Sequence, residues 1–192
     1  MRKLAQAFFE RPAVELAPDL IGKIIVRKIG GSEFLARIVE TEAYVGTHDL
    51  ACHASKGRTT RTEIMFGPAG HAYVYLIYGI HNMFNIVAGE IGDPQAVLIR
   101  AAEHLESWST NLSGPGKFTS GMQITRAENG LKVTGRQLYL IDDDSDRPRV
   151  VATPRIGVDY AQEWKHELLR FLDPSSDAVS HRTRFAFRGE DP

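Results

Sequence analysis

The chain has 192 residues with 23 basic and 24 acidic side chains, a formal net charge of −1. This length can bury one sizeable core, and the ordinary apolar and charged content indicates one globular domain, residues 1–192. The near-neutral charge argues against nucleic-acid binding through bulk charge, although a local basic patch would suffice. The longest apolar runs are too short to cross a bilayer, and Glu10, Arg11 and Pro12 interrupt any signal-peptide core. We therefore expect a cytoplasmic protein, nucleoid-associated in a prokaryote, with no membrane partner.

The first hundred residues alternate short apolar segments with turns that contain glycine. The Gly30-Gly31 pair is a favoured two-residue connection between antiparallel strands. Residues 46–70 have no sustained hydrophobic period and contain four glycines, which is typical of a long functional loop. The predicted elements of this half are, in chain order, a helix at Pro12–Leu20 and strands at Lys23–Ile29, Ser32–Thr41, 72–77, 83–88 and Ala96–Arg100.

The second half mixes segments of helical and extended character. We predict, in chain order, helices at Ala101–Asn111 and from Ser113 to about Arg126, and extended segments at Leu131–Ile141 and Val150–Val158, with Trp164–Leu172 left ambiguous. The polar sequence after Asp173 predicts a mobile tail from about residue 174. Because short turns join consecutive strands, the order favours an α+β fold with a largely antiparallel, curved sheet, flanking helices and a protruding β-hairpin.

Two glutamates lie two residues apart in the strand segment Arg37–Tyr44. With a period of two, one face of that strand is expected to carry Ile38, Glu40, Glu42 and Tyr44. Strand glutamates usually form a solvent-facing stripe, but the apolar neighbours on this face argue against full solvation. A carboxylate beside apolar walls is costly unless it has partners, and active sites accept that cost when the group acts as a base.

Three tyrosines follow in the segment Tyr73–Gly79. Tyr73 and Tyr75 share a strand face, so a ring could stack on a planar ligand in an adjoining pocket, although tyrosines at such positions are often ordinary core residues. Tyr78 precedes Gly79 at the expected hairpin tip, where an aromatic ring is badly placed for a core. An exposed aromatic tip suits a wedge between base pairs. A carboxylate beside several flat rings therefore indicates a hydrolase that holds a planar group such as a nucleobase.

A cluster of His48, Asp49, Cys52 and His53 could ligate a metal. Its spacing matches no recognised zinc pattern, so a metal-dependent hydrolase that uses His48, Asp49 and His53 stays an alternative. Cys52 is the only cysteine, which rules out an intrachain disulfide and fits a reducing compartment.

Two segments offer cations to a phosphate backbone. Lys56–Arg61 contains three cations and no acid, although such a run is also typical of a solvated loop. Gly114–Lys117 is expected to open a helix, and a glycine-opened helix N-terminus followed by lysine can hold a single phosphate, including one in DNA.

At these residues the chain resembles the alkyladenine (3-methyladenine) DNA glycosylase family. The Glu-Thr-Glu-Ala-Tyr block at 40–44 and the Tyr-Val-Tyr-x-x-Tyr-Gly block at 73–79 are highly specific together. The remaining matched segments, all in one order, are Leu20–Lys23, Arg37–Val39, Ala51–His53, Met65-Phe66, Asn85-Ile86, Val97–Arg100, Gly114–Lys117, Arg155–Val158, Glu163-Trp164 and Leu169–Phe171.

The resemblance implies a monomer that extrudes a damaged purine from double-stranded DNA and hydrolyses its N-glycosidic bond. It implies no metal, no cofactor and no Schiff-base lyase step, and the lesions include 3-methyladenine, 7-methylguanine, hypoxanthine and ethenoadenine. By motif position, Glu42 is the general base that activates water. Arg100 and the backbone carbonyl of Val158 help to hold that water.

The same resemblance assigns the substrate and DNA contacts. Tyr44, His53 and Tyr75 sandwich the flipped base, and Asn85 lies on the pocket wall and clashes with the amino group of guanine. Tyr78 fills the gap left in the base stack. The residues implied to contact DNA elsewhere are Arg58, Arg61 and Lys117. A non-catalytic module that binds damaged DNA is the remaining alternative.

Overall fold

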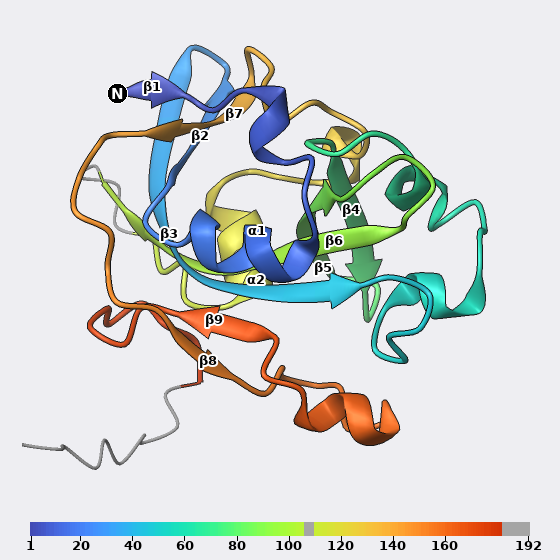
Figure 1. Cartoon of the computed structure of the whole chain (residues 1–192). Coiled ribbons are helices and arrows are strands. Elements are labelled where there is room, and N and C mark those ends of the chain that lie inside the picture. The colour runs from blue at the N-terminus through green and yellow to red at the C-terminus, as the bar shows by residue number, and fades with distance from the viewer. Residues whose placement is uncertain (106–109, 182–192) are drawn as a thin grey trace, which may run out of the picture.

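A computed structural model of the chain describes residues 1–105 and 110–181 (Figure 1). Over these ranges nine strands form one sheet in which every strand pair is antiparallel, and two α-helices accompany it, so the predicted α+β class is confirmed. No helix within them is long and apolar enough to cross a membrane. The strands are β1 Arg2–Lys3, β2 Ile24–Ile29, β3 Ser32–Val45, β4 Ala72–Ile77, β5 His81–Ala88, β6 Gln95–His104, β7 Leu138–Asp142, β8 Val151–Thr153 and β9 Arg170–Leu172, and the helices are α1 Ala13–Leu20 and α2 Pro115–Gly121.

The long strand β3 organises the sheet. The strand order is β1-β7-β2-β3-β6-β5-β4, and β9 pairs with both β3 and β8. The β3–β6 register shifts on either side of Glu40. At the same point the other edge of β3 changes partner, from β2 up to Arg37 to β9 from Glu40 onward. Such bulges bend and twist a strand, and Figure 1 shows β3 turning as it passes from β2 toward β9.

The bulge changes which face of β3 each side chain occupies. Ile38 and Ala43 are five residues apart, yet both lie in the main hydrophobic core, which strict alternation would forbid. Between them, Val39 packs with Leu172 in a separate cluster. The prediction that Ile38 shares a face with Glu42 is therefore wrong, because the register shift reverses the alternation between the two residues.

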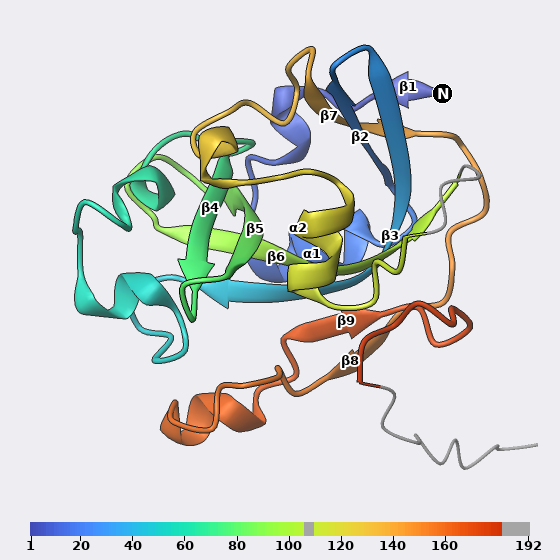
Figure 2. The ribbon, with the colours of Figure 1, turned by 180° about the vertical axis from the view of Figure 1, so that it is seen from behind.

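The main core joins both helices to one face of the sheet. Helix α1 buries the i, i+3, i+4, i+7 positions expected of an amphipathic helix, namely Ala13, Leu16, Ala17 and Leu20. From α2, Phe118 packs against Phe84 of β5, with ring centroids 6.1 Å apart and both side chains fully buried. Figures 1 and 2 show the two helices in the middle of the molecule, with the sheet passing around them.

The glycines at the two hairpin turns have the backbone angles that the turns require. Gly30 and Gly31 have φ values of 57° and 82°, as a type I′ turn needs, so the predicted β2–β3 connection is confirmed. The β4–β5 hairpin turns through Tyr78 and Gly79, at φ 52° and 74°. Tyr78 is 85% exposed, so the predicted aromatic tip is confirmed as a surface feature.

Three predicted elements of the second half are wrong in part. Ala101–His104 continues strand β6 instead of starting a helix, because Ala101 and Ala102 pair with β3 and are buried there; residues 106–109 of that prediction lie outside the described residues. The second helix ends at Gly121, well before Arg126. Of the predicted strand Leu131–Ile141, only the part from Leu138 belongs to β7.

The segment after β9 packs against the sheet, whereas the sequence predicts a mobile tail from about residue 174. Ser176, Val179 and Ser180 are buried, and Val179 packs with Val39 and Leu172. The polar composition is misleading because the buried serines make hydrogen bonds in the interior. The rest of the predicted tail, residues 182–192, lies outside the described residues.

We expect Phe84→Ala to lower the free energy of unfolding by about 3–5 kcal/mol, because the change leaves a cavity between β5 and α2. Urea-induced unfolding measures this. Ile91→Ala is the matched control, since Ile91 is 75% exposed and its loss should cost little. Equal costs for the two variants would contradict the packing of α2 on β5.

Candidate active site

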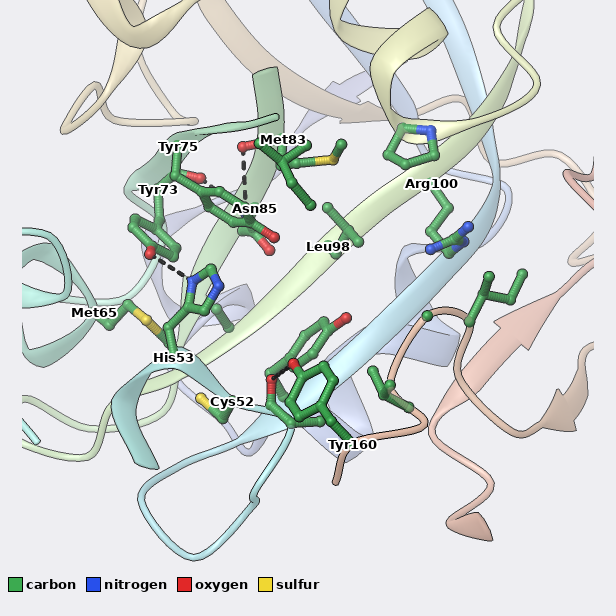
Figure 3. Close-up of a pocket in the computed structure, with 18 of the residues that line it drawn as sticks. Cys52, His53, Met65, Tyr73, Tyr75, Met83, Asn85, Leu98, Arg100 and Tyr160 are labelled. Atoms are coloured by element: carbon green, nitrogen blue, oxygen red, sulfur yellow. Dashed lines mark hydrogen bonds between the residues drawn. The ribbon is translucent and has the colours of Figure 1, made fainter. Parts of the chain in front are cut away.

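A pocket of about 340 Å³ opens on the face of the sheet opposite the main core (Figure 3). Asn85, Leu98 and Arg100 reach it from β5 and β6, while their neighbours Ile86 and Ile99 point into the core. The long loop 46–70 supplies a second wall, and the segment 156–160 supplies a third. The lining residues from these two segments are Ala51, Cys52, His53, Met65, Ile156, Gly157, Val158 and Tyr160.

Glu42 lies fully buried directly behind the pocket lining. Its Oε1 accepts the backbone N–H of Ile156 at 2.8 Å and lies 3.2 Å from Nη1 of Arg100. Its Oε2 accepts the hydroxyl of Tyr44 at 2.9 Å. All three partners line the pocket, so they hold an ionised carboxylate at its border.

Arg100 joins the two glutamates of β3. Its Nε donates to Glu40 at 3.1 Å while Nη1 faces Glu42, so the carboxylates predicted to approach each other are bridged by one guanidinium. Burial opposes the charge of Arg100, but the two carboxylates outweigh it and raise its pKa. Burial and the charge of Glu42 also raise the pKa of Tyr44 well above its ordinary value, so its hydroxyl remains a donor.

An aromatic wall faces Arg100 across the pocket, as Figure 3 shows for His53, Tyr73 and Tyr75. His53 Nδ1 lies 2.9 Å from the Tyr73 hydroxyl, and the His53 and Tyr75 rings are 4.5 Å apart between centroids. Burial, with the nearby charges of Arg61 and Lys56, lowers the pKa of His53 to about 4. His53 is therefore neutral near pH 7, and the wall presents uncharged rings.

Asn85 lines the pocket with its amide held from behind. Its Nδ2 donates to the carbonyl oxygens of Tyr73 at 3.1 Å and Met83 at 3.4 Å. The amide oxygen is therefore the end of the side chain available to a ligand. The residue is 3% exposed, so this orientation is fixed by packing as well as by hydrogen bonds.

The exposed cations lie around the pocket and the hairpin. The guanidinium of Arg61 lies 4.8 Å from the centroid of the Tyr75 ring, and its Nη2 lies 3.4 Å from His53 Nε2. Arg58 lies against Phe66 and 3.4 Å from Glu63, further from the pocket lining. Lys117, on α2, borders a separate groove together with Ile80 at the hairpin tip.

Two features of the site escape sequence reasoning. The backbone N–H of Ile156 bonds to Glu42, but a backbone donor leaves no trace in a sequence. Tyr160 lines the pocket, and only its place just after the Arg155–Val158 block could have drawn attention to it. Val158, whose carbonyl the resemblance assigns to the water, lines the pocket, and that carbonyl accepts the N–H of Ala161 at 2.9 Å.

The three side chains of the metal alternative serve separate contacts. Asp49 is fully buried, and Arg155 binds both its oxygens, at 2.5 and 2.8 Å. His48 packs against Trp164, and His53 bonds to Tyr73. Within residues 1–105 and 110–181 no three His, Cys, Asp or Glu side chains are placed to hold a metal. The geometry therefore gives the metal-dependent alternative no support.

Comparison with known proteins identifies the family. A family model described as methylpurine-DNA glycosylase (MPG) matches residues 7–177. The chain belongs to the methylpurine-DNA glycosylase family. This confirms the family predicted from the sequence, and membership makes the chain a DNA glycosylase, a hydrolase of N-glycosidic bonds.

Three similar relatives each carry the name "Putative 3-methyladenine DNA glycosylase". The protein of Methanocella arvoryzae is 46% identical over 195 residues, covering 95% of this chain and 98% of the relative. That of Legionella pneumophila (strain Paris) is 47% identical over 181 residues, covering 94% and 99%. That of Anaeromyxobacter sp. (strain Fw109-5) is 48% identical, covering 93% and 92%.

The lowered pKa of His53 makes stability depend on pH. The unfolded chain takes up the His53 proton near pH 6.5, whereas the folded chain takes it up only near pH 4. The free energy of unfolding should therefore fall as the pH drops from about 6.5 to about 4. An NMR titration of His53 checks the cause directly, with His53→Gln assigning the signal. A midpoint at or above 6.5 would contradict the buried, cation-flanked setting.

Proposed function

We propose that this chain turns a damaged purine nucleotide out of duplex DNA into the pocket and hydrolyses its N-glycosidic bond with a water activated by Glu42. One observation carries the proposal: a fully buried carboxylate is held by three donors from the pocket lining, across from a wall of flat rings. Hydrolysis of the bond between a purine and its sugar needs a group that accepts a proton from the attacking water. It also needs a surface that binds the purine.

The chemistry of base loss suits this arrangement. As the purine leaves, positive charge develops on the sugar, and an ionised carboxylate near C1′ stabilises that charge while it accepts a proton from water. Arg100 holds Glu42, and the Val158 carbonyl keeps a second lone pair for the water. No lysine is among the described residues that line the pocket, which supports direct attack by water over a Schiff-base lyase step.

The pocket suits alkylated purines such as 3-methyladenine. Tyr44, His53 and Tyr75 offer rings on which a flipped base can stack, and an alkylated purine carries a positive charge that aromatic faces attract. Neutral His53 adds no repulsion to that charge. Asn85 is fixed in the wall by packing and hydrogen bonds, so a base with the extra exocyclic amino group of guanine would clash with it.

The hairpin tip and the surrounding cations suit duplex DNA. Tyr78 is exposed and also lines the pocket mouth, so its ring could enter the stack where the purine leaves. We expect three exposed cations to contact phosphates: Arg61 beside Tyr75, Lys117 in the groove it shares with Ile80, and Arg58 beside Phe66. The proposed stacking rings and the hairpin tip border one pocket, with the proposed base directly behind its lining, and we expect the chain to act as a monomer.

Glu42→Gln should abolish excision, since the amide cannot accept the proton of water. We expect the single-turnover rate on duplexes with 3-methyladenine or hypoxanthine to fall by at least ~10²–10⁴, with affinity for lesion DNA changed only a few-fold. Glu15→Gln, at an exposed position of α1, is the matched control. Excision near the wild-type rate would refute the assignment, and lesion binding by the wild type without base release would favour a damage-binding module.

Tyr78→Ser should slow excision from fully paired duplexes, because nothing then replaces the stacking lost when the nucleotide flips. The melting temperature should barely change, since the side chain is 85% exposed. The loss should shrink for a lesion in a mismatch, where opening the duplex costs less.

Ile91→Ser is the control for Tyr78, because Ile91 is also a large, exposed hydrophobic residue but lies past the opposite end of β5. It should leave excision from both kinds of duplex unchanged. A large fall in melting temperature for Tyr78→Ser, with the same rate loss on paired and mismatched lesions, would identify Tyr78 as a packing residue.

A further inference from the structure

Behind Glu42, four buried charged side chains form one connected network. Glu40 and Glu42 are fully buried, and Arg100 and Arg170 are 5% and 2% exposed. Arg100 contacts both carboxylates, and Nε of Arg170 donates to Glu40 at 2.6 Å. The network contains two negative and two positive groups, so its formal charge is balanced, and the loss of any single one leaves a net charge.

The segment after β9 completes the network from the side away from the pocket. The backbone N–H of Ser180 donates to Oε2 of Glu40 at 2.7 Å, and its hydroxyl donates to Oε1 at 3.0 Å. Its carbonyl accepts Nη2 of Arg170 at 2.7 Å. Ser180 is 3% exposed and thus belongs to the interior of the protein.

We propose that Glu40, held by Arg170 and Ser180, is a positioning residue that fixes Arg100 and thereby sets the orientation and basicity of Glu42. The segment after β9, up to Ser180, then contributes to catalysis by holding Glu40 in place. This inference rests on the proposed role of Glu42 as the general base. Glu40 itself does not line the pocket.

The geometry explains why Arg100 needs Glu40. The Nε of Arg100 is anchored on Glu40, which leaves Nη1 aimed at Glu42. Without that anchor, the guanidinium could turn to give Glu42 two donors, as paired arginine and carboxylate groups favour. A carboxylate held in that way is a weaker base and is turned away from the water.

Charge balance gives a second effect in the same direction. If Glu40 loses its charge, Arg100 and Arg170 together face Glu42 alone. The excess positive charge stabilises the carboxylate of Glu42 and makes it harder to protonate. The activity should then persist to lower pH but reach a slower plateau, because a weaker base accepts the proton of water less readily.

The other titratable groups near Glu42 do not compete for this effect. They are Tyr44 on β3, Tyr75 on β4, Arg100 on β6, and Arg155 and Tyr160 on the segment after β8. The pKa of each tyrosine is raised, chiefly by burial, and both arginines stay charged. None of these five groups changes charge on the acid side of neutrality. His53, across the pocket, takes up its proton near pH 4, but it does so in the wild type and in Glu40→Gln alike, so it does not produce a difference between them.

The test is the single-turnover excision rate of Glu40→Gln measured across pH. We expect a plateau slower by about 10²-fold, as for a misplaced catalytic group. We also expect the acid limb of the pH–rate profile, where the excision rate falls as the pH drops, to move to lower pH by about one unit. Affinity for lesion DNA should change only a few-fold. A residue that only stabilises the fold would lower the melting temperature and leave the acid limb in place.

A charge-balanced double variant separates positioning from folding. Glu40→Gln with Arg170→Met removes one charge of each sign, so the acid limb should return toward its wild-type position. The control is Glu128→Gln, which breaks the buried Arg27–Glu128 pair (2.7 Å) away from the pocket. It should lower stability without moving the acid limb.

Ser180→Ala keeps the inference testable if Glu40→Gln does not fold. It removes one donor to Glu40 and should slow the plateau several-fold at unchanged DNA affinity. An unshifted acid limb in folded Glu40→Gln, or an unchanged rate in Ser180→Ala where Glu40→Gln cannot be studied, overturns the inference. Full activity of Glu42→Gln would instead overturn the proposed function, and the two failures are therefore distinct.

Discussion

The burial of two carboxylates on β3 constrains much of the rest of the structure. An ionised carboxylate removed from water is costly unless charged or polar donors replace its hydration. Here those donors come from far along the chain: Arg100 from β6, Arg170 from β9, Ile156 from the segment after β8, and Ser180 from beyond β9. The need to satisfy these two side chains ties the C-terminal third of the protein to the central sheet.

The bulge at Glu40 makes this arrangement possible. It lets β3 leave β2 and pair with β9, which brings Arg170 beside Glu40. It also reverses the alternation of side chains, so that Ala43 faces the core while its neighbour Glu42 faces the pocket lining. In a regular strand, Ile38 and Ala43 would lie on opposite faces. The bulge lets both pack in the main core while Glu42 faces the pocket.

The protein surface and the pocket differ in how their charges are arranged. The chain is almost neutral overall, so its proposed attraction to DNA rests on a few placed cations and on the exposed hairpin tip. The pocket lining includes a neutral histidine and five tyrosines, with the carboxylate of Glu42 directly behind it. This combination suits the proposed substrate, a positively charged purine that has left the duplex.

The sequence by itself determined the features that depend on neighbours in the chain. Alternation placed Tyr73 and Tyr75 on one face, the paired glycines set the β2–β3 turn, and the motif around Glu42 indicated the family. Tertiary structure decided the rest. Ala101–His104 has the composition of a helix but pairs with β3 as part of a strand. The polar segment after β9 is buried because Ser180 hydrogen-bonds to Glu40. The physical reason is that these outcomes depend on hydrogen bonds and ion pairs between residues far apart in sequence, whose formation local propensity does not encode.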